Sequence, residues 1–270
     1  MAEDMLDRSK FELVFDEHFT SSTLNADRWL PLYLPHWSSR EASQARYEVG
    51  GGRLWLRIDE DQAPWSPEYN GGIKVSNLQT GTFSGPLGST TGQHQFTEGL
   101  RVREEQPESR LYLPQFGLVE IRARAVTHPQ CMVALWLIGF EDEPQRSGEI
   151  CIMEVFGSEV GRKDSLVGMG VHPFGDSTLS EDFEKVRVAG DLTDFHTYSA
   201  AWDSDRIDFY IDDVLVKTSG PAPKYPMQLM LNIYEFPESR MIPQASSELQ
   251  EKVFVVDFVR GWTPTRPAEE

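Results

Sequence analysis

The sequence predicts an all-β protein, and three observations support that prediction. Apolar and polar residues alternate with a period of two in short segments along most of the chain, as in half-buried strands. Turn-forming residues separate these segments. Helical candidates are few, and the best of them, residues 246–254, is short. Because half-apolar sheets must cover one another, many short strands of this kind form a sandwich or a barrel.

The clearest strand candidates follow one another along the chain. They are RLWLRI (53–58), LVEIRARAV (118–126), DRIDFYI (205–211), VLVKTS (214–219) and VFVVDFV (253–259). The sequence NGG at 70–72 and Gly175 mark turns. Asp212-Asp213 stands between two strand candidates, so it is predicted to be the turn of a hairpin.

A long segment without alternation, residues 79–106, interrupts the strands. It could link two domains, but the strands on its two sides are of the same kind. Residues 1–270 are therefore predicted to form a single domain with a long surface loop. The length of 270 residues agrees with this, because one sandwich often reaches that size.

The formal net charge of -18 limits the choice of partners. It repels phosphate backbones and anionic lipids, so nucleic acid and membrane surfaces are not expected partners. No basic patch is evident that would bind sulfate groups. No apolar run approaches the roughly 18 residues of a spanning helix. Cys131 and Cys151 lie in apolar runs and are expected to be free, buried thiols, although one bridge between them is conceivable.

The first residues, MAEDMLDRSKFELVF, have neither the basic nor the apolar region of a signal peptide. The protein is therefore expected to be cytoplasmic, or secreted with its leader already removed. A monomer is expected.

The segment SGEICIMEVFG (147–157) contains the most informative pattern. In a regular strand, Glu149 and Glu154 would point to opposite faces, which would place Glu154 in the core. Burying an unpaired carboxylate costs several kcal/mol or forces the group to stay protonated. A β-bulge between Cys151 and Glu154 shifts the phase, so that Glu149, Cys151 and Glu154 share one face. The sequence therefore predicts a bulged strand with two acids on one side.

This arrangement permits a known chemistry. With the bulge, the two glutamate backbones lie about four strand steps apart, or ~13 Å. Side chains that lean together can approach the ~5 to 5.5 Å separation of carboxyl groups in retaining glycoside hydrolysis. The alternative is a pair of acids that merely face solvent, but their neighbours are too apolar for a solvated strand.

These residues carry a family resemblance. GEICIMEVFG resembles the E-x-D-x-x-E signature of glycoside hydrolase family 16, in the laminarinase-like group of endo-β-glucanases. Further segments occur in the order that the family shows. They are FDEHF, FGLVEIRARAV, ALWLIG, VGMGVHPF, FHTYSAAWDSDRIDFYIDDVLV, PMQLMLNIYEFP and VVDFVRGW. The resemblance implies a β-jelly-roll sandwich, of the concanavalin A-like kind, with a concave substrate cleft.

The resemblance also implies roles for particular residues. Glu149 is expected to be the nucleophile and Glu154 the general acid/base of a retaining, endo-acting hydrolase. Its expected substrate is a β-1,3-glucan or a mixed β-1,3/1,4-glucan, and no cofactor is required for the reaction. By resemblance, the expected substrate-binding residues are Trp136, His172, Asn232 and Arg101. Trp37 and Tyr234 lie in loop-like or strand-end positions, where they could add sugar subsites or be ordinary packing residues.

Two residues depart from the family pattern. Cys151 stands where the family has an aspartate that is thought to support the nucleophile, and a neutral thiol is a weaker donor. Met132 stands where many members have the first tryptophan of the sugar platform. These departures keep two alternatives open: a catalytically silent carbohydrate-binding sandwich, and a galactan hydrolase of the same family.

Some members hold a structural Ca²⁺, and three positions here match its ligands. They are Glu17, the carbonyl of Gly52, and Asp257. Oxygen ligands suit this ion, so Ca²⁺ is expected to bind there.

Overall fold

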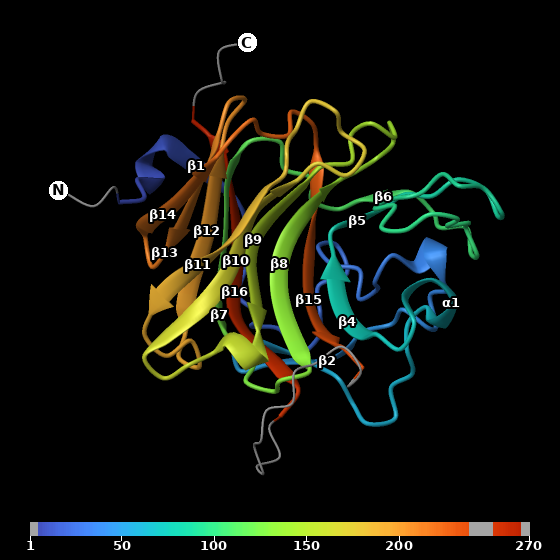
Figure 1. Ribbon diagram of the computed structural model, residues 1–270, viewed down its shortest axis with the longest axis horizontal. Coiled ribbons are helices and arrows are strands. Elements are labelled where there is room, and N and C mark those ends of the chain that lie inside the picture. The colour runs from blue at the N-terminus through green and yellow to red at the C-terminus, as the bar shows by residue number, and fades with distance from the viewer. Residues whose placement is uncertain (1–4, 238–250, 266–270) are drawn as a thin grey trace.

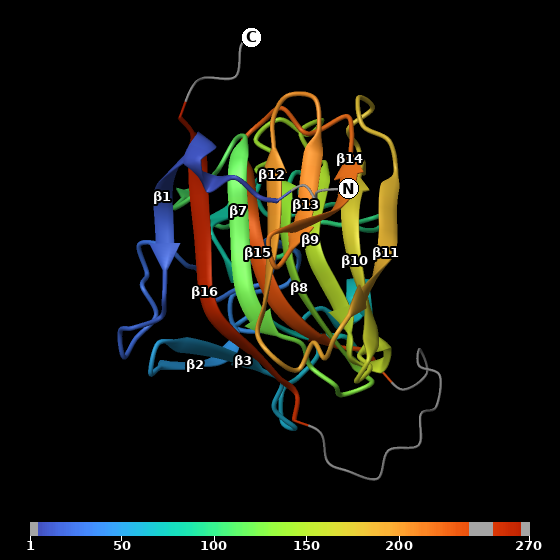
Figure 2. The same ribbon diagram turned by 90° about the vertical axis from the view of Figure 1, so that its left-hand side faces the viewer.

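The computed structural model describes residues 5–237 and 251–265. It consists of antiparallel strands in two large sheets that pack face to face, with a long loop region beside one of them (Figures 1 and 2). The short helices are η1 (Arg8–Lys10), η2 (Pro35–Trp37), α1 (Pro67–Asn70) and η3 (Gly157–Glu159). The strands are β1 (Phe11–Glu17), β2 (Arg46–Gly50), β3 (Arg53–Arg57), β4 (Lys74–Gln79), β5 (Gly81–Thr82), β6 (Ser109–Arg110), β7 (Gly117–Arg124), β8 (Cys131–Gly139), β9 (Glu149–Phe156), β10 (Asp164–His172), β11 (Asp182–Ala189), β12 (His196–Trp202), β13 (Ile207–Ile211), β14 (Val214–Ser219), β15 (Met227–Glu235) and β16 (Val253–Pro264).

The order of strands in each sheet differs from their order in the chain. The eight-stranded sheet runs β14-β13-β12-β7-β16-β3-β2, and β1 also pairs with β16. The six-stranded sheet runs β11-β10-β9-β8-β15-β4. Strands far apart in sequence, such as β4 and β15, are therefore neighbours. The predicted all-β jelly-roll sandwich is confirmed.

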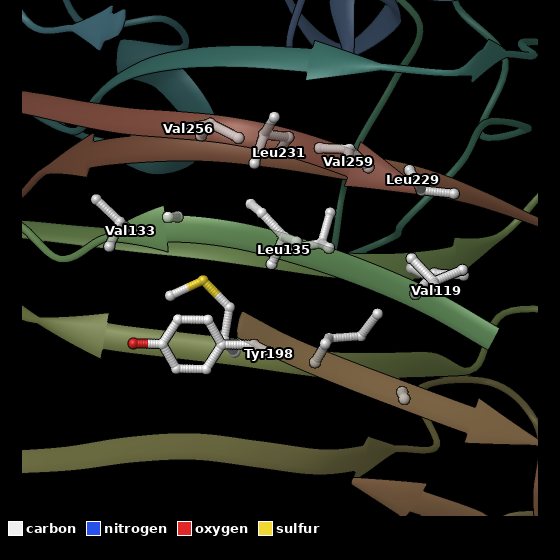
Figure 3. Close-up of a cluster of buried hydrophobic side chains, with 14 of the residues drawn as sticks. Val119, Val133, Leu135, Tyr198, Leu229, Leu231, Val256 and Val259 are labelled. Atoms are coloured by element: carbon white, nitrogen blue, oxygen red, sulfur yellow. The ribbon is translucent and has the colours of Figure 1, made fainter. Parts of the chain in front are cut away.

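The main hydrophobic core lies between the two sheets (Figure 3). Val133 and Leu135 of β8 face Val119 of β7 and Tyr198 of β12, and all four are fully buried. Alternate residues of β8 point to the opposite side, away from this core. The alternation that predicts strands thus also gives the six-stranded sheet a second, outer face.

All five strand candidates correspond to strands of the structure, with ends that differ by a few residues. The hairpin prediction is also correct, because β13 pairs with β14 and both Asp212 and Asp213 have a positive φ, as a tight hairpin turn requires. Of the predicted helix, residues 246–250 lie outside the described residues. Its last two residues, 253–254, begin β16 instead, because they pair with β3 and bury Phe254 in the core.

The long segment after β4 packs against the sandwich. Its Gln93 side chain donates hydrogen bonds to the carbonyl of Phe140 (2.9 Å) and to Oε1 of Gln228 (2.7 Å). Its ends are joined where β5 pairs with β6. The segment is therefore a folded loop region that lies on the six-stranded sheet.

Both cysteines are free and buried, as expected. Among residues 5–237 and 251–265, no helix is long and apolar enough to cross a membrane.

Candidate active site

Strand β9 contains the predicted bulge. Against β8, Cys151 is opposite Trp136 and Met153 is opposite Leu135, which leaves Ile152 without a partner residue. Ile152 and Met153, although adjacent, both belong to the core between the sheets. The extra residue therefore changes the phase of the strand, as the spacing of its acids predicts.

As a result, Glu149, Cys151 and Glu154 line one cavity on the outer face of the six-stranded sheet. The cavity has a volume of about 320 Å³, which is within the usual range for a small-ligand site. Its floor also includes Met132, Ala134 and Trp136 of β8, and loop residues form its walls. The remaining lining residues are Tyr33, Asn70, Ile73, His94, Phe96, His172, Phe174, Tyr234 and Phe236.

The carboxyl groups of Glu149 and Glu154 are both partly shielded from solvent. Burial, followed by the charges of Glu154 and Glu181, raises the pKa of Glu149 well above its usual value. Burial also raises the pKa of Glu154, but the positive charges of Lys185 and His172 oppose that rise. The pair therefore retains a proton at a pH where two exposed glutamates are both ionised.

Cys151 does not support Glu149 as an aspartate at this position is thought to do. Its Sγ donates a weak hydrogen bond to the carbonyl of Gly168, at 3.8 Å. Burial and the charges of Glu154 and Glu149 raise the pKa of the thiol well above its usual value. Cys151 is therefore a neutral group between the two acids.

His172 is fixed beside the acids by two contacts. Its Nδ1 lies 2.7 Å from Oε1 of Glu181, and its ring stacks on Phe183 with 4.7 Å between the ring centroids. His172 lines the cavity as expected, and Trp136 and Tyr234 do so too. Three of the six substrate-binding candidates thus line the cavity, and their role in binding a substrate stays a prediction.

The other three candidates do not line the cavity. Trp37 is fully buried, and its Nε1 donates to the carbonyl of Gln93 at 2.8 Å. Trp37 therefore stabilises the loop region that contains Gln93. Arg101 is exposed and its Nη1 donates to the carbonyl of Gly88 at 3.1 Å. Asn232 is fully buried on β15, opposite Ala134. Both amide atoms of Asn232 are buried and lack a hydrogen-bond partner in the part of the chain that the structure describes.

His94 is a cavity residue that sequence reasoning missed. Its backbone N–H donates to Oε1 of Glu141 at 2.5 Å, and its ring packs edge-on against Trp136 and Phe174. Burial lowers the pKa of His94 to about 3, so the imidazole is neutral at physiological pH. Because its partners come from distant parts of the chain, no local pattern around His94 indicates this position.

Tyr33 is a second cavity residue absent from the sequence prediction. Its ring meets that of Tyr234 edge-to-face, with 5.5 Å between centroids. Burial raises the pKa of both phenols, so both stay protonated. The two rings form a wall that can contact the apolar face of a sugar and can also donate hydrogen bonds to it.

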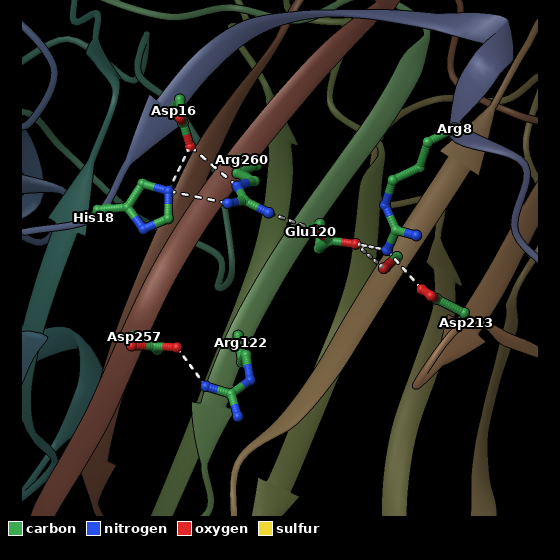
Figure 4. Close-up of polar contacts among 9 residues, drawn as sticks. Arg8, Asp16, His18, Glu120, Arg122, Asp213, Asp257 and Arg260 are labelled. Atoms are coloured by element: carbon green, nitrogen blue, oxygen red, sulfur yellow. Dashed lines mark hydrogen bonds and ion pairs between the residues drawn. The ribbon is translucent and has the colours of Figure 1, made fainter. Parts of the chain in front are cut away.

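The predicted calcium ligands are only partly suited to a cation. Oε2 of Glu17 is buried, and the guanidinium of Arg28 lies 3.6 Å from it. Asp257 forms an ion pair with Arg122 on the outer face of the eight-stranded sheet (Figure 4). Within the described ranges, no group of three or more acidic, histidine or cysteine side chains could hold a metal ion. Ca²⁺ binding at Glu17, Gly52 and Asp257 therefore stays a prediction.

The raised pKa of Glu149 makes folding stability depend on pH. A carboxyl group whose pKa is higher in the folded state binds more protons there, so stability falls as pH rises above its usual pKa. Glu149→Gln removes this loss and is expected to raise the Tm at pH 7 but hardly at pH 4. Each unit of pKa is worth about 1.4 kcal/mol, so the gain should be at least about 2 °C.

Thermal unfolding at both pH values checks this expectation. The exposed Glu98 provides the matched control, because Glu98→Gln should give the same small difference at pH 4 and pH 7. A gain from Glu149→Gln that is equal at the two pH values would contradict the argument.

A buried and a half-buried carboxyl group that face one sugar-sized cavity on a β-sandwich define a candidate glycoside hydrolase. Comparisons with known proteins agree. A family model described as glycosyl hydrolases family 16 matches residues 108–243, just over half of the chain. The chain therefore belongs to glycosyl hydrolases family 16. No curated protein matches the sequence.

Several solved structures resemble this protein. The GlcNAcα1-4Gal-releasing endo-β-galactosidase from Clostridium perfringens has a TM-score of 0.84 and 27% identity, over 98% of this chain and 66% of that one. A laminarinase from Flavobacterium sp. UMI-01 has a TM-score of 0.63 and 17% identity, over 93% and 100% of the two chains. An endo-β-1,3-glucanase from Pyrococcus furiosus has a TM-score of 0.62 and 18% identity, over 94% of this chain and 95% of that one. This chain thus spans slightly less than two thirds of the galactosidase, while the two glucanases share its fold.

Proposed function

We propose that this protein is a retaining endo-glycosidase that uses Glu149 and Glu154. The observation that carries the proposal is the bulge, which turns both acids of β9 to one cavity. Glu149 attacks the anomeric carbon and forms a glycosyl-enzyme ester, while Glu154 gives its proton to the departing oxygen. Glu154 then takes a proton from water, which attacks the ester and frees Glu149.

The mechanism requires Glu149 to be ionised when Glu154 is protonated. Burial raises the pKa of both carboxyl groups, so the pair keeps a proton, although Lys185 and His172 oppose the rise at Glu154. That proton must lie on Glu154 when the substrate is bound. A glycosidic oxygen next to Glu154 favours this, because it accepts a hydrogen bond only from the protonated form.

For the substrate, we propose a β-galactoside in place of the β-glucan that the sequence alone suggests. Two observations support a β-galactoside over a β-glucan as the substrate. The likeness to the endo-β-galactosidase, at 27% identity and a TM-score of 0.84, exceeds that to the two glucanases. Met132 and Cys151, the two departures from the glucanase pattern, both line the cavity.

A glycan panel tests both parts of the proposal. The substrates are mucin glycans that end in GlcNAcα1-4Gal, agarose, laminarin and lichenan, each with product sizing. Release of galactose-ended oligosaccharides, abolished by Glu149→Gln, is the expected result. Cleavage of laminarin or lichenan alone would restore the glucanase prediction. Binding without any product would favour the silent carbohydrate-binding alternative.

Cys151→Asp tests the departure in the signature. An aspartic acid at this position can donate a stronger hydrogen bond to Glu149 than the thiol does, so we expect higher turnover or a shifted pH profile. Cys151→Asn is the matched control, since it has a similar shape but cannot ionise. If both variants behave like the parent protein, the surrounding site already compensates for the missing aspartate.

A further inference from the structure

Three arginines surround one aromatic ring on the outer face of the eight-stranded sheet. The guanidinium carbons of Arg53, Arg122 and Arg124 lie 4.9, 4.9 and 5.3 Å from the ring centroid of Phe195. Arg53 comes from β3, the other two arginines from β7, and Phe195 from the residue before β12. These positive charges therefore meet only in the folded protein, in a chain whose formal net charge is -18. We call this group the arginine cluster.

The arginine cluster has more positive charge than its surroundings neutralise. Elsewhere on this face the arginines are paired with acids: Arg8 contacts Glu120 and Asp213, and Arg260 contacts Asp16 (Figure 4). Within the cluster, Asp257 pairs with Arg122.

Arg53 and Arg124 are different in this respect. Among the described residues, neither guanidinium lies within 4.0 Å of a carboxylate. Arg53 is exposed and Arg124 is half-buried. Two guanidiniums that stay close together without acid partners make a favourable place for an anion, especially one with several oxygen atoms.

A sugar-sized surface adjoins the cluster. Trp55 lies two residues after Arg53 on the same face of β3, about 7 Å along the strand. Val255 is the partner of both Trp55 and Arg124, so Trp55 and Arg124 are about 10 Å apart across the sheet. The half-exposed Trp55 lines a depression of about 350 Å³, whose rim includes Glu48, Asp59 and Lys252.

We propose that this face holds a second glycan-binding site, separate from the catalytic cavity, for a sugar that carries a carboxylate or a sulfate. One ring stacks on Trp55, where the rim offers partners for hydroxyl groups, and the anionic group of a neighbouring unit lies between Arg53 and Arg124. The main core separates this site from the cavity on the other sheet.

Three small sugars test the proposal by titration calorimetry: lactose, lactose 3′-sulfate and 3′-sialyllactose. We expect at least one of the anionic sugars to bind at least about tenfold more tightly than lactose, and less tightly as NaCl rises. The double variant Arg53→Gln/Arg124→Gln should abolish this preference. Arg162→Gln/Arg187→Gln, which removes the same charge from exposed arginines elsewhere, should preserve it.

Trp55→Ala should weaken binding of the same sugars in the parent background, and thermal unfolding of each variant checks that the fold persists. The comparison of the two anionic sugars shows which group is preferred. Equal affinity for all three sugars, or an unchanged preference in the Arg53/Arg124 variant, would overturn the proposal. Inorganic sulfate bound as tightly as lactose 3′-sulfate would show a site for an anion only, and would overturn the glycan part.

Discussion

Replacing Glu154 with alanine is expected to lower the turnover of a natural glycan by about 10²- to 10⁴-fold, because the leaving oxygen then departs without a proton. The loss should be much smaller for an aryl β-glycoside, whose leaving group needs no acid. Glu149→Ala should inactivate the protein on both substrates, because no covalent intermediate can form. Steady-state kinetics on the two substrates therefore separate the two roles.

Azide provides the control for this assignment. A small anion can attack the glycosyl-enzyme in the space left by Glu154→Ala, which gives a β-glycosyl azide. In Glu149→Ala it can only attack the substrate directly, which gives the α-azide. The opposite outcome in the two variants would mean that Glu149 is the acid and Glu154 the nucleophile.

Gly170→Ala is expected to cause the largest loss of stability among single-residue changes near the site. Gly170 faces Cys151 at the bulge and has a φ of +140°. An added Cβ would lie 2.0 Å from the carbonyl oxygen of Asp182 and 2.7 Å from the Cα of Phe183. Backbone strain and overpacking each cost about 1 to 3 kcal/mol, so we expect a loss of about 3 kcal/mol or more and a drop in Tm of about 10 °C.

Thermal unfolding and activity measure this effect together. Gly50→Ala is the matched control, because nothing lies within 4 Å of its added Cβ and its φ is ordinary. It should change the Tm by a degree or two at most. Since β10 sets the geometry of the bulge, Gly170→Ala should also reduce activity in the fraction that stays folded. A Tm like that of Gly50→Ala would show that β10 can move away from β11 at little cost.

The strands and the bulge could be predicted because their causes lie within a few consecutive residues. A period of two places alternate residues in the core, and VFVVDFV becomes part of β16 for that reason. The end of the helix predicted at 246–254 was wrong because Phe254 has a place in the core and strand partners on β3, which a local pattern does not show.

The substrate-binding residues were harder to predict. Trp136 and Tyr234 lie on strands, where the alternation already gives their face. Trp37 and Arg101 lie in loops, whose paths depend on contacts such as those of Gln93 with Phe140. For loop residues, neither residue type nor family position decided whether the side chain would reach the cavity.

The sequence alone determined the all-β sandwich and the common direction of Glu149 and Glu154. A regular strand would bury Glu154 in the core without a partner, whereas a bulge turns both acids to the same face. The tertiary structure decided what surrounds these acids. Only folding brings His94 onto the cavity wall and gathers Arg53 and Arg124 around Phe195, since these contacts join residues that are far apart in the chain. The absence of a basic patch in the sequence was therefore misleading, because charge density depends on distance in space rather than along the chain.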